Sequence, residues 1–204
     1  DGIESQWQVN HVSQMYLYEQ LQDALLLAAS DRGHATVTAV SSAAHYRAQN
    51  IPFSISEINS NENDYVPFNR YCETKLANVL FAMEAQRRID ELSKNVYVNS
   101  LHPGMVATEF VRESNIKVFV GEYLGKMIYQ FVKDFIARIA WDSETASLTQ
   151  IYTAVSPEIH EKNIKATYFH PIARPVSKVS VLATSENAAK LWKSTKKLLN
   201  SKMD

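Results

Sequence analysis

Three residues in this sequence have side chains suited to exchanging a proton with an alcohol or carbonyl oxygen. Tyr71 and Lys75 lie four positions apart in "YCETKLANVLFAMEAQRR" (71–88), and Ser42 ends the run "VTAVSS". An isolated phenol titrates at about pH 10, and an ammonium group within a few ångströms favours its ionised form. A tyrosine tuned in this way can exchange a proton with the oxygen while hydride moves at the adjacent carbon, and a serine hydroxyl can hold that oxygen. The set is suited to carbonyl–alcohol oxidoreduction.

A helical pattern positions Tyr71 and Lys75. Leu76, Leu80 and Met83 recur at helical spacing, which predicts a helix that begins near Tyr71. Side chains four residues apart on a helix meet, so Tyr71 and Lys75 are expected to be neighbours in its first turn. An ordinary aromatic residue followed by an ordinary surface lysine has the same spacing, and that alternative stays open.

Strands alternate with helices along the chain, which predicts an α/β fold with a parallel sheet and right-handed crossovers. The polar stretch at 49–64 is expected to be a loop. The expected helices are 5–29, 71–92, 114–139, 143–155 and 185–199, the last with Ser185 as N-cap, and the expected strands are 34–42, 96–101 and 165–170.

The first two predicted strands each end in residues that point to a site. Ser41 and Ser42 end the first strand, and "HPG" (102–104) ends the second. Ligands of parallel α/β sheets bind at the carboxyl ends of the strands. The helix that carries Tyr71 connects these two strands, so its first turn is expected to lie near Ser42.

Composition limits the classes of function. The 204 residues suit one domain, 1–204, and a formal net charge of -1 gives no electrostatic case for a nucleic-acid partner. Cys72 is the one cysteine, which favours a reducing compartment, so a cytoplasmic protein is expected, with association with an intracellular membrane left open. No apolar run approaches the length of a membrane span, and the six scattered histidines predict no metal site.

Five motifs occur in a fixed order along the chain: "WQVNHVSQMYL", "VTAVSSAAH", "YCETKLANVLF", "VNSLHPGMVATE" and "LWKSTKKLL". Together they resemble the short-chain dehydrogenase/reductase family, and more narrowly its retinol-dehydrogenase-like branch and the WW-domain-containing oxidoreductases. The resemblance runs over nearly the whole chain. It implies the carboxyl-terminal part of a Rossmann-like, doubly wound parallel sheet.

The resemblance implies catalytic roles for four residues. Tyr71 would be the general acid/base, and Lys75 would lower the pKa of Tyr71 and bind the nicotinamide ribose. Ser42 would orient the substrate oxygen, and Asn10 would hold a proton-relay water through its helix. Ordinary structural roles stay open as well, because Asn10 can cap a helix kink and Ser42 can cap a turn.

The resemblance also implies a nicotinamide dinucleotide, NADP or NAD. Besides Tyr71 and Lys75, the residues that would contact it are Pro103, Gly104, Val106 and Thr108. The sequence departs from the family at its front, because its five glycines form no G-x-x-x-G-x-G turn for the pyrophosphate. The chain is therefore expected to lack the glycine-rich amino-terminal half of the fold, and to bind the cofactor only when that half is present.

Three hypotheses of function follow. In the first, the protein is an NAD(P)-dependent oxidoreductase that interconverts an alcohol and a carbonyl on a lipophilic substrate resembling a retinoid or a steroid. In the second, it is a truncated, catalytically inactive remnant that acts as an interaction module. A third hypothesis is a non-enzymatic regulator, a scaffold that borrowed the fold. In each case a homodimer through the helices at 5–29 and 67–92 is a further expectation.

Overall fold

Four strands form the sheet at the centre of the fold. The structure is a computed structural model that describes residues 2–59, 65–104 and 141–203. β1 pairs with β2 and β2 with β3 in parallel, whereas β3 pairs with β4 in antiparallel fashion. The structure therefore confirms the predicted α/β class with a mostly parallel sheet. In spatial order the strands are β1 (Ala35–Val40), β2 (Val96–Leu101), β3 (Tyr168–His170) and β4 (Arg174–Val176).

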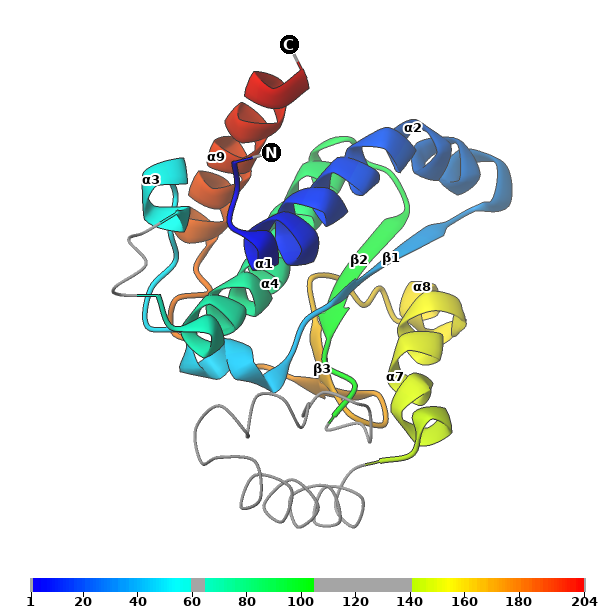
Figure 1. Ribbon diagram of the computed structural model, residues 1–204. Helices are drawn as coiled ribbons and strands as arrows, with labels where there is room; N and C mark the ends of the chain where they lie inside the picture. Colours follow the sequence, from blue (N-terminus) through cyan, green and yellow to red (C-terminus); the bar gives the residue numbers. More distant parts are fainter. Residues whose placement is uncertain (1, 60–64, 105–140, 204) are drawn as a thin grey trace.

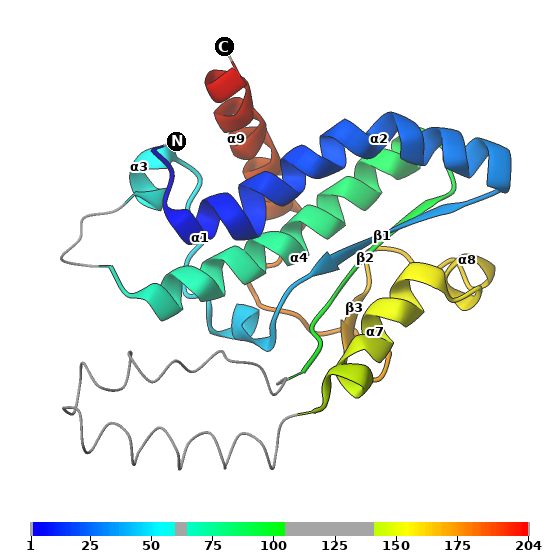
Figure 2. The ribbon, with the colours of Figure 1, turned by 45° about the vertical axis from the view of Figure 1, so that its right-hand side comes forward.

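Helices cover both faces of this sheet. They are α1 (Ser5–Trp7), the π-helix η1 (Gln8–Val12), α2 (Ser13–Arg32), the 3-10 helix η2 (Ala43–Arg47), α3 (Ile55–Ile58), α4 (Pro67–Glu91), α7 (Ser143–Val155), α8 (Glu158–Glu161) and α9 (Ser185–Met203). Figure 1 and Figure 2 show α2 and α4 on one face and α7 and α8 on the other. The last helix, α9, packs against α4.

Several predicted boundaries agree with the structure. The strand predicted at 96–101 is β2, and the helix predicted at 143–155 is α7. The helix predicted at 5–29 is a continuous series of α1, η1 and α2 that ends at Gly33, whose φ of 86° places it in the left-handed C-cap conformation. The helix predicted at 114–139 lies outside the described residues.

Two helix starts were predicted wrongly. The helix expected to open at Tyr71 begins at Pro67, so Tyr71 lies in its second turn. Proline is favoured in the first helical turn, where its missing N–H has no partner to lose. At the last helix the N-cap is Thr184 rather than Ser185, because the Thr184 hydroxyl accepts from the Asn187 N–H at 3.1 Å.

Two short elements were missed. The stretch predicted as loop contains α3, which a capping box starts: the Ser54 hydroxyl accepts from the Glu57 N–H, and the Glu57 carboxylate accepts from the Ser54 N–H. β4 also escaped prediction, because the reversal before it uses Ile172 and Ala173 at positive φ, without the glycine that usually marks such a turn.

Apolar surface lies along the free edge of β1. Within the described residues β1 pairs only with β2. Beside it, Leu17 and Leu21 of α2 are 57% and 47% exposed and line a groove of about 440 Å³ with the residues of β1. An unpaired strand edge next to exposed leucines is a surface on which a further strand could pair.

Gln86 of α4 completes the hydrogen bonding of the buried strand β2. Beyond the two-residue pairing with β3, the Gln86 carboxamide oxygen accepts from the Val98 N–H at 2.7 Å. Its Nε2 donates to the Val96 carbonyl at 3.2 Å. A helix side chain thus replaces part of a missing neighbouring strand, and Gln86 is itself 2% exposed.

We predict that Gln86→Leu destabilises the fold by about 2–4 kcal/mol, because it leaves one buried N–H and one buried carbonyl of β2 without their partner. The measurement is urea-induced unfolding followed by circular dichroism. The same change at the exposed Gln20 of α2 is the control and should shift stability by less than about 0.5 kcal/mol. Equal stability of the two variants would contradict this role of Gln86.

Candidate functional site

Tyr71 and Lys75 lie together on successive turns of α4, at the carboxyl end of β1. The Lys75 Nζ is 5.6 Å from the centre of the Tyr71 ring. The same Nζ donates to the carbonyl of Val40, the last residue of β1, at 3.4 Å. Burial lowers the pKa of Lys75 from its usual value. The Tyr71 ring and the Lys75 ammonium group therefore lie together at the carboxyl end of β1, the edge of the sheet at which the sequence predicted a site.

The two serines after β1 make different hydrogen bonds. Ser41 is buried, and its hydroxyl donates to the Lys75 carbonyl at 2.6 Å, which ties the end of the strand to α4. The Ser42 hydroxyl caps η2 by accepting from the Ala44 N–H at 3.2 Å. Because Ser42 acts as an acceptor in that bond, its hydroxyl proton can still be donated to another oxygen.

Asn78 is a further polar residue between α4 and the end of β1, and it was not predicted from the sequence. Its Nδ2 donates to the Val40 carbonyl at 3.1 Å, so Lys75 and Asn78 both bind the last carbonyl of β1. Asn78 is 1% exposed. Its position three residues after Lys75 puts it on the same face of the helix, and that spacing is a signal from which the residue could have been found.

Asn10 reaches α4 through Thr74. It lies in the π-helix η1, and its Nδ2 donates to the Thr74 hydroxyl at 3.1 Å. That hydroxyl in turn donates to the carbonyl of Tyr71 at 2.8 Å. π-Helical turns within α-helices often occur at functional sites. The structure thus connects Asn10 to the backbone of Tyr71, and it also shows the helix irregularity that the structural alternative for Asn10 assumed.

Pro103 and Gly104 follow β2 at the same edge of the sheet. Gly104 has φ of 91°, and a Cβ at this position would lie 3.1 Å from Pro171 Cγ. Its N–H donates to His102 Nδ1 at 3.2 Å. The positive φ and the close contact that a Cβ would make with Pro171 both favour glycine here, which leaves backbone without a side chain next to the strand ends. The other two expected cofactor contacts, Val106 and Thr108, lie outside the described residues.

The residues present fit one end of a nicotinamide dinucleotide. Lys75 presents a cationic donor at the end of β1, and Gly104 presents backbone without a side chain at the end of β2. The sequence contains no glycine-rich turn for the pyrophosphate. In the described part of the chain, no group of three or more His, Cys, Asp or Glu side chains could hold a metal ion. Across the same residues, no helix is long and apolar enough to cross a membrane.

Known proteins are similar to this chain in sequence. Human retinol dehydrogenase 13 is 31% identical over 201 residues, covering 98% of this chain and 55% of that protein. Short-chain dehydrogenase TIC 32 A of Brassica napus is 28% identical over 203 residues, covering 98% of the chain and 58% of that protein. This chain is a homologue of the short-chain dehydrogenases/reductases. The family resemblance predicted from the ordered motifs is thereby confirmed.

A further relative is similar to this chain over the whole length of the chain. Human WW domain-containing oxidoreductase is 28% identical over 209 residues, covering 100% of the chain and 45% of that protein. The chain spans about half the length of the curated relatives it matches. No protein-family model matches the sequence.

Solved structures support the fold alone. A crystal structure of an uncharacterized protein from Mycobacterium paratuberculosis superposes with a TM-score of 0.61 at 23% identity, covering 96% of this chain and 59% of that one. The NADPH-bound carbonyl reductase from chicken fatty liver gives a TM-score of 0.50 at 13% identity, covering 84% of this chain and 55% of that one.

We predict that Gly104→Ala is more destabilising than Gly33→Ala, by about 1 kcal/mol or more. Both glycines have positive φ, so both substitutions incur backbone strain of about 1–2 kcal/mol. Only at Gly104 does the new Cβ also crowd Pro171, whereas nothing lies within 4 Å of it at Gly33. Urea unfolding of the two variants measures the difference, and equal losses of stability would show that the contact with Pro171 is unimportant.

We also predict a pH dependence from Lys75. Its pKa is lowered in the folded protein, so burying the charged form costs stability at low pH, and this cost disappears as the pH rises through the folded-state pKa towards the unfolded value of about 10.4. The stability of the unsubstituted chain relative to Lys75→Met should therefore increase with pH on approaching that value. Urea unfolding between about pH 7 and pH 10.5 tests this, with Lys94→Met on the surface as control. A difference that stays constant with pH would contradict it.

Proposed function

We propose that the complete protein is an NAD(P)-dependent oxidoreductase that interconverts an alcohol and a carbonyl. The observation that carries the proposal is the placement of the Lys75 ammonium group beside the Tyr71 ring at the carboxyl end of β1. The chain would form the carboxyl-terminal portion of one short-chain dehydrogenase/reductase domain, 1–204. Its relatives include proteins named retinol dehydrogenase, which supports a lipophilic substrate resembling a retinoid or a steroid.

In this proposal Tyr71 is the general acid/base. During oxidation its phenolate takes the hydroxyl proton of the alcohol as the carbonyl forms, and during reduction its phenol returns that proton to the oxygen. The bound nicotinamide supplies or accepts the hydride. Lys75 stabilises the phenolate through its positive charge, and the Ser42 hydroxyl donates a hydrogen bond to the reacting oxygen.

Further residues would bind and orient. Lys75 would donate to the nicotinamide ribose, and Pro103 and Gly104, followed by Val106 and Thr108, would contact the carboxamide and the phosphates. Asn10 would hold a proton-relay water through its helix. NADP is favoured over NAD by the resemblance to retinol dehydrogenases, and binding of either requires a glycine-rich turn that this sequence does not contain.

The second candidate function is an inactive interaction module, and a different observation favours it. The missing glycine-rich turn leaves the pyrophosphate without its usual site, while the free edge of β1 and the exposed Leu17 and Leu21 offer a surface for another protein. Either function is compatible with a homodimer through α2 and α4. Either is also compatible with a cytoplasmic location, with or without attachment to a membrane. Quenching of tryptophan fluorescence by NADPH separates the two: the complete protein should show it if the protein is an enzyme.

We predict that Tyr71→Phe in the complete protein lowers kcat by about 10²- to 10⁴-fold, because the variant cannot transfer the proton. Cofactor binding, measured by fluorescence titration with NADPH, should stay nearly unchanged. The control is Tyr16→Phe on the exposed face of α2, which should retain full turnover. Retained turnover in Tyr71→Phe would refute the acid/base role.

A further inference from the structure

His11 is a buried titratable residue that the proposed mechanism does not use. It follows Asn10 in the π-helix η1 and is 2% exposed. Its Nε2 lies 3.0 Å from the Thr195 hydroxyl of α9, and a side-chain hydrogen bond joins its ring to Asn78 of α4. The Trp7 ring meets it in a T-shaped contact, with ring centres 5.4 Å apart. His11 therefore connects η1, α4 and α9 through polar contacts in the interior of the protein.

Asn78 continues these contacts from His11 to the candidate site. The Asn78 Nδ2 donates to the Val40 carbonyl at 3.1 Å, and the Lys75 Nζ donates to the same carbonyl at 3.4 Å. Because both donors share one acceptor oxygen, the polar group that Asn78 turns towards Val40 also lies close to the Lys75 ammonium group. The orientation of the Asn78 carboxamide therefore decides whether Lys75 lies beside an N–H group or beside a carboxamide oxygen.

The partners of His11 decide which of its ring nitrogens is the donor. Asn78 uses its Nδ2 on Val40, which leaves its carboxamide oxygen as the acceptor for His11. Burial lowers the pKa of His11 to about 4, and the hydrogen bond with Asn78 acts in the opposite direction, as a partner does that accepts from the ring. The ring is thus neutral near pH 7 and has one N–H group. Nδ1 carries it towards Asn78, and Nε2 accepts from the Thr195 hydroxyl.

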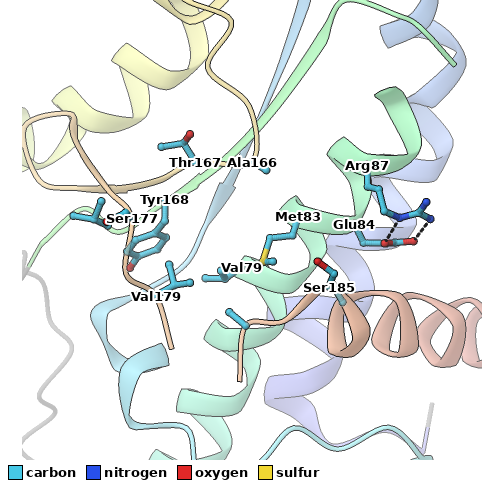
Figure 3. Close-up of a pocket in the computed structure, with 13 residues that line it drawn as sticks. Val79, Met83, Glu84, Arg87, Ala166, Thr167, Tyr168, Ser177, Val179 and Ser185 are labelled. Atoms are coloured by element: carbon cyan, nitrogen blue, oxygen red, sulfur yellow. Dashed lines mark hydrogen bonds and ion pairs between the residues drawn. The ribbon is translucent and has the colours of Figure 1, made fainter. Parts of the chain in front are cut away.

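We call Thr195, His11 and Asn78 the His11 network, and it has no room for a ligand. Asn78 is 1% and Thr195 4% exposed. A cavity of about 510 Å³ opens beside the same stretch of α4, but Val79 and Met83 line it and no member of the network does (Figure 3). The cavity that Thr195 borders measures about 20 Å³, which is too small for anything larger than water. The network can therefore act on the candidate site only through its own hydrogen bonds.

We propose that His11 is a positioning residue of the candidate site, which holds the Asn78 carboxamide so that its N–H group, rather than its oxygen, lies beside Lys75. Thr195 of α9 holds the His11 ring in turn. An Asn78 oxygen beside Lys75 would bind the ammonium group and draw it away from Tyr71, whose ring centre is 5.6 Å from the Lys75 Nζ. With the N–H group there, the remaining donors of Lys75 stay available to Tyr71.

Two substitutions of His11 separate this role from simple packing. His11→Phe keeps a ring beside Trp7 but removes the donor, so the Asn78 carboxamide can turn its oxygen towards Lys75. That oxygen favours the charged form of Lys75, so the pKa of Lys75 should rise by about 0.5 or more. His11→Asn is the matched control. It loses the ring but keeps an N–H group that can donate to Asn78, so the pKa of Lys75 should stay as it is in the unsubstituted chain.

The measurement is an NMR titration of the Lys75 side chain, labelled with ¹³C at Cε, in this chain and in both variants. A rise of the pKa in His11→Phe alone supports the inference. The same pKa in both variants, whether shifted or not, overturns it, because lost packing would affect both and a purely structural His11 would affect neither.

A measurement on the unsubstituted chain guards against a variant that fails to fold. Spectra of the protein with ¹⁵N-labelled histidine should show a neutral His11 ring near pH 7, with a proton on Nδ1 and none on Nε2. A proton on Nε2 instead would mean that the ring donates to Thr195 and leaves the Asn78 oxygen without its donor, which overturns the inference.

The effect of His11 on turnover rests on the proposed function, and the complete protein tests it separately. His11→Phe should shift the pH–rate profile of alcohol oxidation to higher pH, because a Lys75 drawn towards Asn78 stabilises the Tyr71 phenolate less, and His11→Asn should restore the profile. An unchanged profile in His11→Phe would contradict the positioning role. A complete protein without any turnover would refute the proposed function alone, since the Lys75 titration and the His11 spectrum still decide the placement of Asn78.

Discussion

The hydrogen bonds between the end of β1 and the middle of α4 determine the geometry of the whole site. The Ser41 hydroxyl binds the Lys75 carbonyl, and the Lys75 and Asn78 side chains both bind the Val40 carbonyl. These three bonds run in both directions between strand and helix, so neither element can slide along the other without breaking at least one of them. Tyr71 keeps its place relative to the strand end because it lies one turn before this junction.

This junction between β1 and α4 has a free-energy cost, because it places the charged side chain of Lys75 in a partly dehydrated position. The ammonium group of Lys75 loses part of its hydration, and burial lowers its pKa accordingly. A carbonyl at 3.4 Å compensates only partly for this loss. The positive charge nevertheless lies next to the Tyr71 ring, where the acid/base role proposed for Tyr71 would use it.

The sequence predicted those parts of the fold that depend on local pattern. β2 was placed correctly because "VYVNSL" is strand-like and is stopped by "HPG", and α7 because its residues follow a helical pattern. β4 was missed because its pairing with β3 depends on a turn built by Ile172 and Ala173, which have no turn propensity of their own. Proximity of Tyr71 and Lys75 followed from helical spacing alone. Helical spacing could have indicated Asn78 as well, but its hydrogen bond to Val40 joins residues 38 positions apart, and only the folded chain reveals that contact.

The chain holds Tyr71, Lys75 and Ser42, the residues of the proposed proton transfer, but its sequence contains no glycine-rich turn, and the α/β topology explains why these two parts of a site can be separated. Successive strand ends along one edge of a sheet contribute neighbouring parts of a site. Here β1 and β2 contribute the serine pair and the glycine at 104, while the free edge of β1 marks where the sheet stops within the described residues. A strand added at that edge, with a glycine-rich turn further along the sheet, would extend the site without moving Tyr71 or Lys75. The exposed Leu17 and Leu21 line the apolar groove beside this edge, so the described residues leave both backbone hydrogen-bonding groups and apolar surface available there to a further strand.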